Sequence, residues 1–379
     1  MNQALRLSSL SIVSFLSIWL GISALLVSTS LAQVNGSGPS PSSLFDTVIN
    51  LPDDVALIVG SVGGVAGQTT QLNVTSGGTV AAFFFADSGS EVNISGGIVG
   101  GDFEANSGSE INISGGEVGN SFDAQSGSMV NISGGDVGNL FDALSGSEVN
   151  ISGGAVGVGF EAFGDSEVNI SGGVVGGGFD AFGGSEVNIS GGEVGAGFDA
   201  LSGSEVNISG GVVLDGFDAF DGSVVNISGG VVGNLAGPAL QIPAFNAFGG
   251  SEVNILGSEF QIDGSQLDTL LLGEAFTITD RDVVLSGLLA DGEQFSFVLL
   301  STDLPGFDFF SPGATLTVTL TSPVLLGDVN LDGVVDFFDI APFITLLSNG
   351  GTQAEADINQ SGEINFLDVA PFIGLLTGQ

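Results

Sequence analysis

A nineteen-residue repeat constrains the fold of this chain more than any other feature of its sequence. The tripeptide Asn-Ile-Ser recurs at that interval, with its asparagines at Asn93, Asn112, Asn131, Asn150, Asn169, Asn188, Asn207 and Asn226. Outlying copies contain Asn73 and, after a nine-residue insertion with Pro238 and Pro243, Asn254. Self-similarity at such a period is typical of stacked repeats that contact only their neighbours, and these copies predict about ten stacked units.

One copy, residues 109–127, alternates polar and apolar residues in short runs separated by Gly and Ser. This alternation is typical of strands, and the paired glycines in every copy disfavour helices. The sequence therefore predicts a mainly β fold, a parallel β-helix (β-solenoid) of about ten coils with one 19-residue repeat per coil. The side chains expected to face inward in this copy are Ile111, Ile113, Val118, Phe122 and Ala124.

Equal spacing stacks identical residues about 4.8 Å apart, in columns that run along the solenoid. The column expected to form an aromatic core contains Phe84, Phe103, Phe122, Phe141, Phe160, Phe179, Phe198, Phe217 and Phe245. The asparagines of the repeat are expected to form a second column, a ladder in which each side-chain amide donates to one neighbour and accepts from the other.

Two columns of carboxylates are expected on the outside of the coils. The first contains Glu91, Glu110, Glu148, Glu167, Glu186, Glu205 and Glu252, and the second contains Glu104, Asp123, Asp142, Glu161, Asp180, Asp199 and Asp218. Unit charges about 4.8 Å apart repel by about 0.9 kcal/mol even in water, so both columns oppose folding unless salt or cations screen them. We favour a solvated acidic face that prevents edge-to-edge aggregation. Capture of divalent cations or of another ligand is the alternative.

A further column follows the inward alanines and contains Leu144, Phe163, Phe182, Leu201, Phe220 and Phe248. Simple alternation points these side chains outward, where they would form a partner-binding stripe. We favour the interpretation that the corner of each coil bends them back into the core, because exposed apolar patches of that length are uncommon on monomers.

The balance of charges disfavours several classes of function. The chain has 43 acidic residues, two basic residues and neither His nor Cys, for a net charge of −41. It therefore cannot build a Ser-His-Asp triad, a cysteine nucleophile or a zinc site with His or Cys ligands. Binding to nucleic acid is not expected, because it depends on Lys and Arg to neutralise phosphates. The basic residues are Arg6 and Arg281, and we expect Arg281 to pair locally with acids.

Residues 1–32 have the layout of a cleavable signal peptide, with Arg6 before an apolar run from Leu10 to Val27 and the small residue Ala32 at the end. This layout predicts a secreted or cell-surface, extracellular protein; an uncleaved anchor is the alternative. No later segment resembles a membrane span. The remaining chain divides into an N-terminal leader and solenoid cap (33–70), the repeat solenoid (71–255), a β-rich C-terminal cap (256–326) and a C-terminal domain (327–379).

The most specific chemical signal lies in this C-terminal domain. Oxygen ligands occupy positions 1, 3, 5, 7, 9 and 12 of a calcium loop, and Gly333 occupies position 6, where a sharp turn is required. The ligands are the side chains of Asp328, Asn330, Asp332, Asp336 and Asp339 and the carbonyl of Val334.

A second copy of the loop lies 29 residues further on. Its ligands are the side chains of Asp357, Asn359, Ser361, Asn365 and Asp368 and the carbonyl of Glu363. We expect it to bind Ca²⁺ more weakly, because fewer of these ligands are charged. An apolar helix is predicted after each loop, and the two loop–helix units are expected to pack together.

Paired twelve-residue calcium loops that end in Asp, each followed by one helix, resemble a type I dockerin over residues 327–379. The resemblance implies calcium-dependent docking onto a cohesin-like protein partner, often in assemblies that hold polysaccharide-degrading enzymes. One departure concerns the partner. Cellulosomal dockerins generally carry polar contacts at loop positions 10 and 11, where this chain has Phe337-Phe338 and Phe366-Leu367. The candidate partners are therefore an unusual cohesin or a surface of the same chain.

Two classes of function remain open. The first is a secreted, non-catalytic structural, scaffold or adhesion protein, which we prefer because neighbouring coils present the same groups, whereas a catalytic site needs unlike residues to converge. The second is a polysaccharide-degrading glycosidase, or a component of such an enzyme complex, with an extracellular polysaccharide as its ligand, because two carboxylates suffice for glycoside hydrolysis. A third, narrower hypothesis makes the acidic columns a calcium store or sensor.

Overall fold

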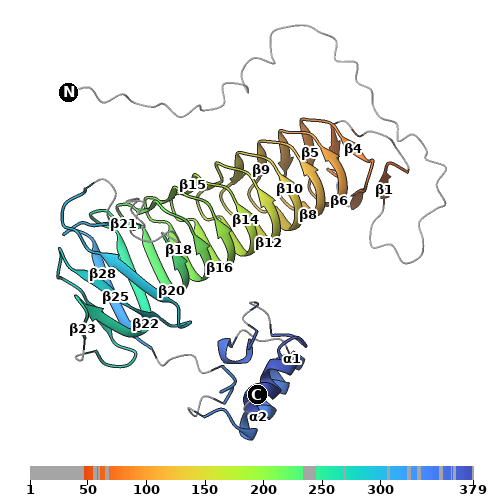
Figure 1. The fold of residues 1–379 in the computed structure, drawn as a ribbon. Coiled ribbons are helices and arrows are strands. Elements are labelled where there is room, and N and C mark those ends of the chain that lie inside the picture. The colour runs from red at the N-terminus through yellow and green to blue at the C-terminus, as the bar shows by residue number, and fades with distance from the viewer. Residues whose placement is uncertain are drawn as a thin grey trace, which may run out of the picture. The chain divides into compact units, whose positions relative to one another are not determined.

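The computed structural model describes residues 47–53, 58, 60–64, 68–233, 245–267, 270–304, 308–321, 326–330, 334–349, 353–359, 361 and 364–377 (Figure 1). The predicted signal peptide and the insertion with Pro238 and Pro243 lie outside these residues. Across the described repeats, the chain winds as a parallel β-solenoid of about nine turns, which confirms the predicted fold class.

Each coil contributes one strand to a long-strand sheet and one to a short-strand sheet. The coil strands of the long-strand sheet are β1 (Thr47–Leu51), β3 (Thr70–Val74), β4 (Thr79–Val80), β6 (Ser90–Val99), β8 (Glu110–Val118), β10 (Met129–Val137), β12 (Glu148–Val156), β14 (Glu167–Val175), β16 (Glu186–Val194), β18 (Glu205–Val213), β20 (Val224–Val232) and β22 (Glu252–Ile262). Those of the short-strand sheet are β2 (Ser61–Val62), β5 (Phe84–Ala86), β7 (Phe103–Ala105), β9 (Phe122–Ala124), β11 (Phe141–Ala143), β13 (Glu161–Ala162), β15 (Phe179–Ala181), β17 (Phe198–Ala200), β19 (Phe217–Ala219), β21 (Phe245–Ala247) and β27 (Phe309–Phe310).

The register between coils places identical residues opposite one another, so that Asn150 pairs with Asn169. The asparagine ladder is confirmed: from Asn93 to Asn254, each Nδ2 donates to the Oδ1 of the asparagine one coil earlier over 2.7–3.1 Å. The ladder also extends beyond the repeats. Asn73 donates to Asn50 over 2.8 Å, and the hydroxyl of Thr317 donates to Asn254.

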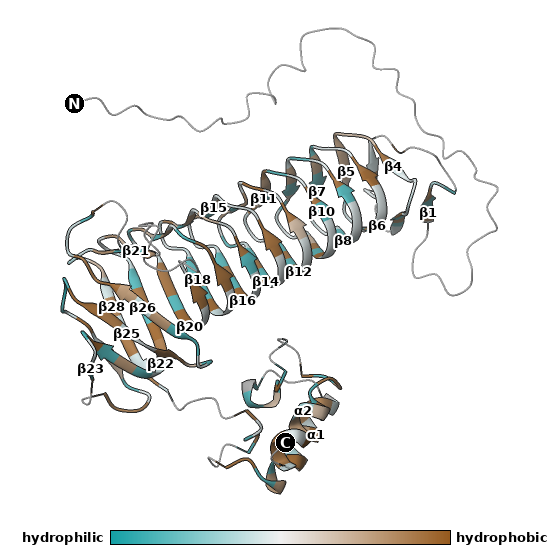
Figure 2. Cartoon of the chain, viewed as in Figure 1, coloured by the Kyte–Doolittle hydropathy of each residue, from teal (hydrophilic) through white to brown (hydrophobic). Residues whose placement is uncertain are grey.

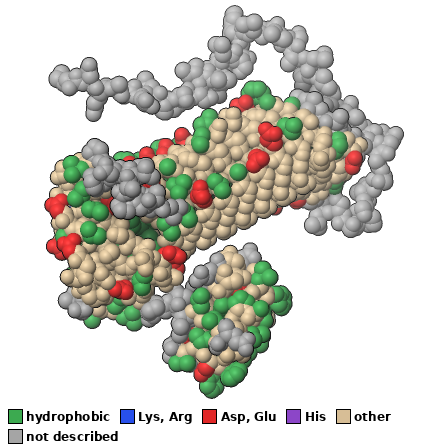
Figure 3. All heavy atoms as spheres, viewed as in Figure 1, with side chains coloured by type: hydrophobic (Ala, Val, Ile, Leu, Met, Phe, Trp, Pro, Cys, Tyr) green, Lys and Arg blue, Asp and Glu red, His purple; other side chains and the backbone are tan. Residues whose placement is uncertain are grey.

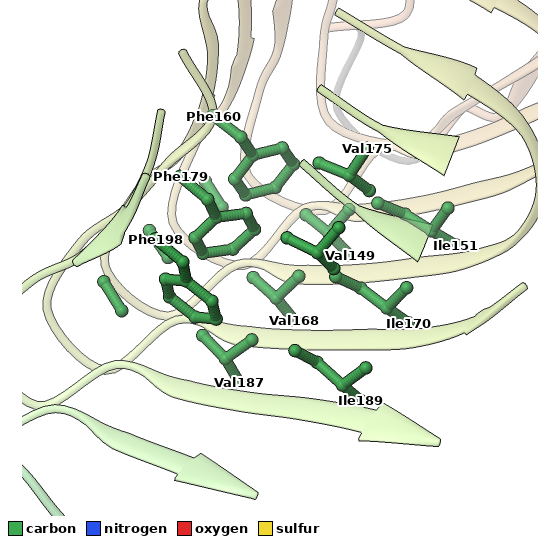
Figure 4. Close-up of a cluster of buried hydrophobic side chains, with 14 of the residues drawn as sticks. Val149, Ile151, Phe160, Val168, Ile170, Val175, Phe179, Val187, Ile189 and Phe198 are labelled. Atoms are coloured by element: carbon green, nitrogen blue, oxygen red, sulfur yellow. The ribbon is translucent and has the colours of Figure 1, made fainter. Parts of the chain in front are cut away.

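The core lies between the two sheets. The predicted aromatic column is fully buried, and successive ring centroids from Phe84 to Phe245 lie 4.6–5.2 Å apart. In Figure 4 the rings of this column face Val and Ile side chains that rise from the long strands. All five residues predicted to face inward in the copy at 109–127 are likewise buried. Each buried Phe contributes about 1.5–3 kcal/mol by leaving water.

The interpretation of the corner column is wrong. Its six members are half-buried and do not belong to the hydrophobic core cluster. The strict alternation of the short strands continues through the corner: Ala162 is buried, and the next residue, Phe163, lies on the outer face. Stacking on the neighbouring coil covers these side chains in part, with the rings of Phe163 and Phe182 5.0 Å apart.

A β-rich cap follows the last repeat. Its strands are β23 (Ser265–Gln266), β24 (Ala275–Thr277), β25 (Val284–Leu289), β26 (Gln294–Val298) and β28 (Thr315–Leu320). β28 adds one more parallel strand to β22, whereas β25 pairs with β22 and β24 with β28 in antiparallel fashion. The parallel pairing thus runs past both ends of the solenoid expected at residues 71–255. At the N-terminal end β1 pairs with β3, and at the C-terminal end β28 pairs with β22.

Burial lowers the pKa of Arg281 and the charge of the neighbouring Asp280 raises it, so the expected local interaction with an acid is present. The hydrogen bonds of the side chain have other partners. Its guanidinium donates instead to the backbone carbonyls of Ile278, Asp280, Phe310, Ser311 and Ala314 over 3.0–3.4 Å. This cation therefore stabilises the turn between β27 and β28. These two strands are the last ones that pair in parallel with the coils, β27 in the short-strand sheet and β28 in the long-strand sheet.

The described residues of the C-terminal module form two short 3₁₀ turns and two helices, η1 (Phe337–Asp339), α1 (Ile340–Asn349), η2 (Ala354–Ala356) and α2 (Val369–Thr377). Its buried core is separate from that of the solenoid and consists of Val329, Phe343, Ala356, Ile358 and Phe372. The hydropathy colouring shows that both helices are largely apolar (Figure 2).

Candidate calcium-binding and docking module

The first loop closes on the carboxylate of Asp339, which is fully buried. Its Oδ1 accepts the N–H of Asn330 over 2.9 Å, and its Oδ2 accepts the N–H of Asp336 over 2.8 Å. Asp336 in turn accepts the N–H of Phe338 over 2.7 Å, so the two carboxylates form a capping box at the start of η1. Residues from both ends of the loop are thereby held at one carboxylate.

The second loop repeats this construction. Asp368 is fully buried, and its two oxygens accept the N–H groups of Asn359 over 3.0 Å and of Asn365 over 2.9 Å. Asn365 accepts the N–H of Leu367 over 2.8 Å, in the same way that Asp336 accepts from Phe338. Two sequence copies therefore fold into two equivalent loop ends, each followed by a helix.

Contacts between the two halves assemble one small module. The rings of Phe343 in α1 and Phe372 in α2, which occupy equivalent positions of the two copies, stack at 4.2 Å. The side-chain amide of Gln353 donates to the carbonyl of Val329 over 2.9 Å, and Gly327 donates to the carbonyl of Glu355 over 2.7 Å. No sequence pattern points to Gln353, because it is a lone amide between two motifs.

The predicted calcium ligands are only partly placed by the structure. Asp328 is buried and 4% exposed, whereas Asp332 and Glu363 lie outside the described residues. In the second loop, the N–H of Ser361 donates to Asp357 over 3.0 Å and to Asn359 over 2.9 Å, which folds the front of that loop into a turn. Within the described part of the chain, no group of three or more acidic side chains is close enough to hold a metal ion.

The donor set nevertheless fits a hard cation. Asp328, Asp339 and Asp368 are at least nine-tenths buried, and a buried carboxylate in its charged form is costly without a positive charge nearby. Carboxylate, amide, hydroxyl and carbonyl oxygens are the ligands that Ca²⁺ prefers. The module contains no Lys, Arg or His that could compensate them instead.

Exposed apolar side chains mark one more feature of the module. Phe337 is 75%, Phe338 76%, Phe366 83% and Leu367 71% exposed. These four residues, called here the loop-exit pairs, immediately precede the two buried aspartates. In the space-filling view the module shows broad green areas (Figure 3). Large exposed apolar areas are typical of surfaces that contact partners.

The second acidic column, called here the carboxylate ladder, lies on the outer face of the short-strand sheet and is half-buried. Burial, together with repulsion from neighbouring carboxylates, raises the pKa of Asp123, Asp142 and Asp199 to about 6. The Glu column of the long-strand sheet differs, since several of its carboxylates accept hydrogen bonds from the asparagine ladder, such as Glu167 from Asn169 over 3.0 Å.

We expect the solenoid to become more stable as the pH falls from 7 to 5. A folded-state pKa near 6, above the ordinary value of 3.8, means that the folded chain takes up protons before the unfolded chain does. The gain begins as the pH falls through about 6 and is complete below about 4, and amounts to about 1–2 kcal/mol after allowance for solvent exposure. Urea unfolding followed by circular dichroism at both pH values measures it.

The triple variant Asp123→Asn, Asp142→Asn, Asp199→Asn serves as the control for this prediction. It should be more stable than the native chain at pH 7 and show a flatter response to pH. An unchanged response in the variant would disprove the assignment to these three carboxyls.

No helix among the described residues is long and apolar enough to cross a membrane.

Comparison with known protein families agrees with the construction of the C-terminal module. No curated protein and no solved structure matches the chain. Residues 326–376, which enclose both loops, α1 and all but the last residue of α2, match the family model of the dockerin type I domain. The chain therefore carries a type I dockerin domain near its C-terminus.

Proposed function

We propose that this protein is a secreted, non-catalytic scaffold or adhesion component whose dockerin domain binds calcium and docks onto a cohesin-like protein. One observation carries the proposal: two equivalent loop ends, built on the buried carboxylates of Asp339 and Asp368, each present an exposed apolar pair. A dockerin domain itself implies docking to a cohesin partner, in a scaffold or an enzyme complex.

Calcium would be held by the side chains of Asp328, Asn330, Asp332, Asp336 and Asp339 with the carbonyl of Val334. The second loop would use Asp357, Asn359, Ser361, Asn365 and Asp368 with the carbonyl of Glu363. The ion supplies the positive charge that the module lacks, so its binding is coupled to the folding of both loops. Asp339 and Asp368 already draw the two ends of their loops together through backbone N–H groups, which preorganises the oxygen ligands.

The repeat supports a structural role for the solenoid. Neighbouring coils align Glu with Glu, Asn with Asn and Phe with Phe, as in the pairing of β14 with β16 and of β15 with β17. A catalytic site brings unlike groups together at one place. The solenoid thus serves as a spacer and surface that carries the docking domain.

One observation favours the second candidate, a glycosidase. Asp142 lies between two other carboxyls of the carboxylate ladder, and its pKa is raised to about 6 by burial first and by these neighbours second. An acid of raised pKa beside an ionised carboxylate is the pair that glycoside hydrolysis requires. Release of reducing sugar from extracellular polysaccharides, lost in Asp142→Asn, would establish this function in place of the scaffold.

We expect calorimetric titration of calcium into the full chain to count about two ions. In the double variant Asp339→Ala, Asp368→Ala both should be lost, and chelation of calcium from the native chain should raise amide exchange in α1 and α2. The control Asp180→Asn, Asp199→Asn removes two charges from the carboxylate ladder and should still bind about two ions. A stoichiometry far above two that survives in the double variant would instead make the acidic columns the calcium site.

We expect docking to depend on the loop-exit pairs. Replacing Phe337, Phe338, Phe366 and Leu367 together by Ser should weaken binding to an immobilised type I cohesin module by about 100-fold or more, because the largest exposed apolar area of the domain is removed. Thr345→Ala with Thr377→Ala, two exposed positions on α1 and α2, is the matched control and should bind like the native chain. Binding that resists both chelation and the fourfold variant would contradict the proposal.

A further inference from the structure

The outer face of the short-strand sheet carries an apolar stripe that is half-buried and lies outside the hydrophobic core cluster. We call it the outer stripe, and it consists of Leu144, Phe163, Phe182, Leu201, Phe220 and Phe248. The rings of Phe163 and Phe182 stack at 5.0 Å and those of Phe220 and Phe248 at 4.7 Å, nearly parallel at 5° and 2°. The stripe therefore repeats once per coil along the solenoid.

The carboxylate ladder runs alongside the outer stripe. Asp142, Glu161, Asp180, Asp199 and Asp218 each precede a stripe residue by two positions, with a buried alanine between them. Residues two apart on a strand lie on the same face of the sheet. The register stacks these carboxylates on one another from coil to coil, so two rows, one apolar and one acidic, run in parallel.

The chain itself cannot neutralise this surface. Arg6 and Arg281 are its only cationic side chains. Arg6 lies in the predicted signal peptide, and the guanidinium of Arg281 is committed to five backbone carbonyls. A second molecule of this protein would bring its own acidic row against the first and would be repelled. Charge complementarity therefore requires an occupant from a different molecule that carries a row of cations beside a row of apolar groups.

The spacing of the rows selects the conformation of the occupant. Side chains at i, i+3 and i+7 of a helix recur about every 5.4 Å along its axis, whereas those at i and i+2 of a strand recur about every 6.7 Å. The coil repeat of about 4.8 Å is closer to the helix. The six stripe positions extend over about 24 Å, which a helix of about 16 residues covers. The stacked rings cover one another's faces, so they offer edges rather than the open ring face that a sugar needs.

We propose that the outer face of the short-strand sheet is a docking surface for a cationic amphipathic helix of another protein. The apolar side of the helix lies on the outer stripe, and its Lys or Arg row lies on the carboxylate ladder. This surface is distinct from the loop-exit pairs, so the solenoid holds its own partner independently of the dockerin domain.

The probe that tests this proposal is a synthetic peptide of about 18 residues of Leu and Lys, with the leucines at i, i+3, i+4 and i+7. Binding to the full chain with calcium present is followed by fluorescence anisotropy at about 0.15 M salt, which screens nonspecific attraction. A peptide of the same composition in scrambled order is the first control. We expect it to bind at least about tenfold more weakly than the amphipathic peptide.

Three double variants assign the site. The stripe variant Phe163→Ser, Phe182→Ser and the ladder variant Glu161→Gln, Asp180→Asn should each weaken binding of the peptide by about tenfold. The control Glu167→Gln, Glu186→Gln removes the same charge from the same two coils on the long-strand sheet, and its affinity should stay within about twofold of the native value. If the stripe variant does not fold, as judged by circular dichroism, Leu144→Ser with Leu201→Ser replaces it.

Equal losses in the ladder variant and in the long-strand control would reduce the effect to general attraction by an acidic protein and overturn the proposal. Full binding by the stripe variant would overturn it as well. Neither result would bear on docking through the loop-exit pairs, since all the variants leave the dockerin domain unchanged.

Discussion

Replacing Arg281 by Leu is expected to lower the free energy of unfolding of the capped solenoid by about 3 kcal/mol or more. The guanidinium donates to five carbonyls: that of Phe310 at the end of β27, those of Ser311 and Ala314 in the turn before β28, and those of Ile278 and Asp280 after β24. Without the guanidinium, these five carbonyls lose a charged hydrogen-bond donor. They lie at the end of the coils, where the cap keeps core residues away from water. Urea unfolding followed by circular dichroism measures the loss.

Arg281→Lys is the matched control for this prediction. It keeps the charge but replaces a planar fork of five N–H donors by three donors at a single nitrogen, so it should lose about half as much stability. A Lys variant as stable as the native chain would mean that charge alone matters. A Leu variant that loses less than about 1 kcal/mol would show that the carbonyls are satisfied in another way.

The second large effect is expected at the Ser-Gly-Gly bend of each long strand. A Cβ on Gly172 would lie 2.4 Å from the carbonyl oxygen of Ser152 in the coil before it, although the φ of Gly172 is ordinary. Gly173 has φ +78°, and its Cβ would lie 2.8 Å from the backbone of Gly153. Because rigid backbone lies on the other side, Gly172→Ala and Gly173→Ala should each cost about 3 kcal/mol or more.

Gly178→Ala separates the steric effect from backbone strain. Gly178 also has positive φ, at +73°, but the nearest atom to its Cβ lies 3.9 Å away. Non-glycine residues already occupy the equivalent corner in earlier coils, for example Leu140 with φ 63°. The Gly178 variant should therefore lose only about 1 kcal/mol in thermal or urea unfolding. If Gly172→Ala cost no more than Gly178→Ala, close contact between coils would not be the reason for the paired glycines.

The sequence was most informative where a pattern repeats. An alternating pattern at a fixed interval of nineteen residues assigns each side chain to the inside or the outside of a coil and stacks it on its own copy. The aromatic core, the asparagine ladder and the outward carboxylates all follow from that rule. The candidate calcium loops and the following helices are likewise local motifs, in which the spacing of the expected ligands and the helix starts lie within twelve residues.

The remaining features depend on contacts between segments that are far apart in the sequence. The corner column lies on the outer face because the alternation of the short strands continues through the corner, which the general rarity of exposed apolar patches does not predict. The role of Arg281 required carbonyls from residues 278–314 to converge, and no spacing in the sequence encodes that convergence. The half-buried state of the carboxylate ladder likewise depends on its neighbours on the same face.

The coil, its core and the spacing of the candidate calcium ligands can be read from the sequence alone, because each of these depends on a periodic or local pattern. The closure of the last coil and the place of the outer stripe beside the carboxylate ladder emerge only in the folded chain. The exposure of the two loop-exit pairs on equivalent loop ends does so as well. These features arise from the packing of distant backbone segments, whose free energy depends on shape and burial rather than on the order of neighbouring residues.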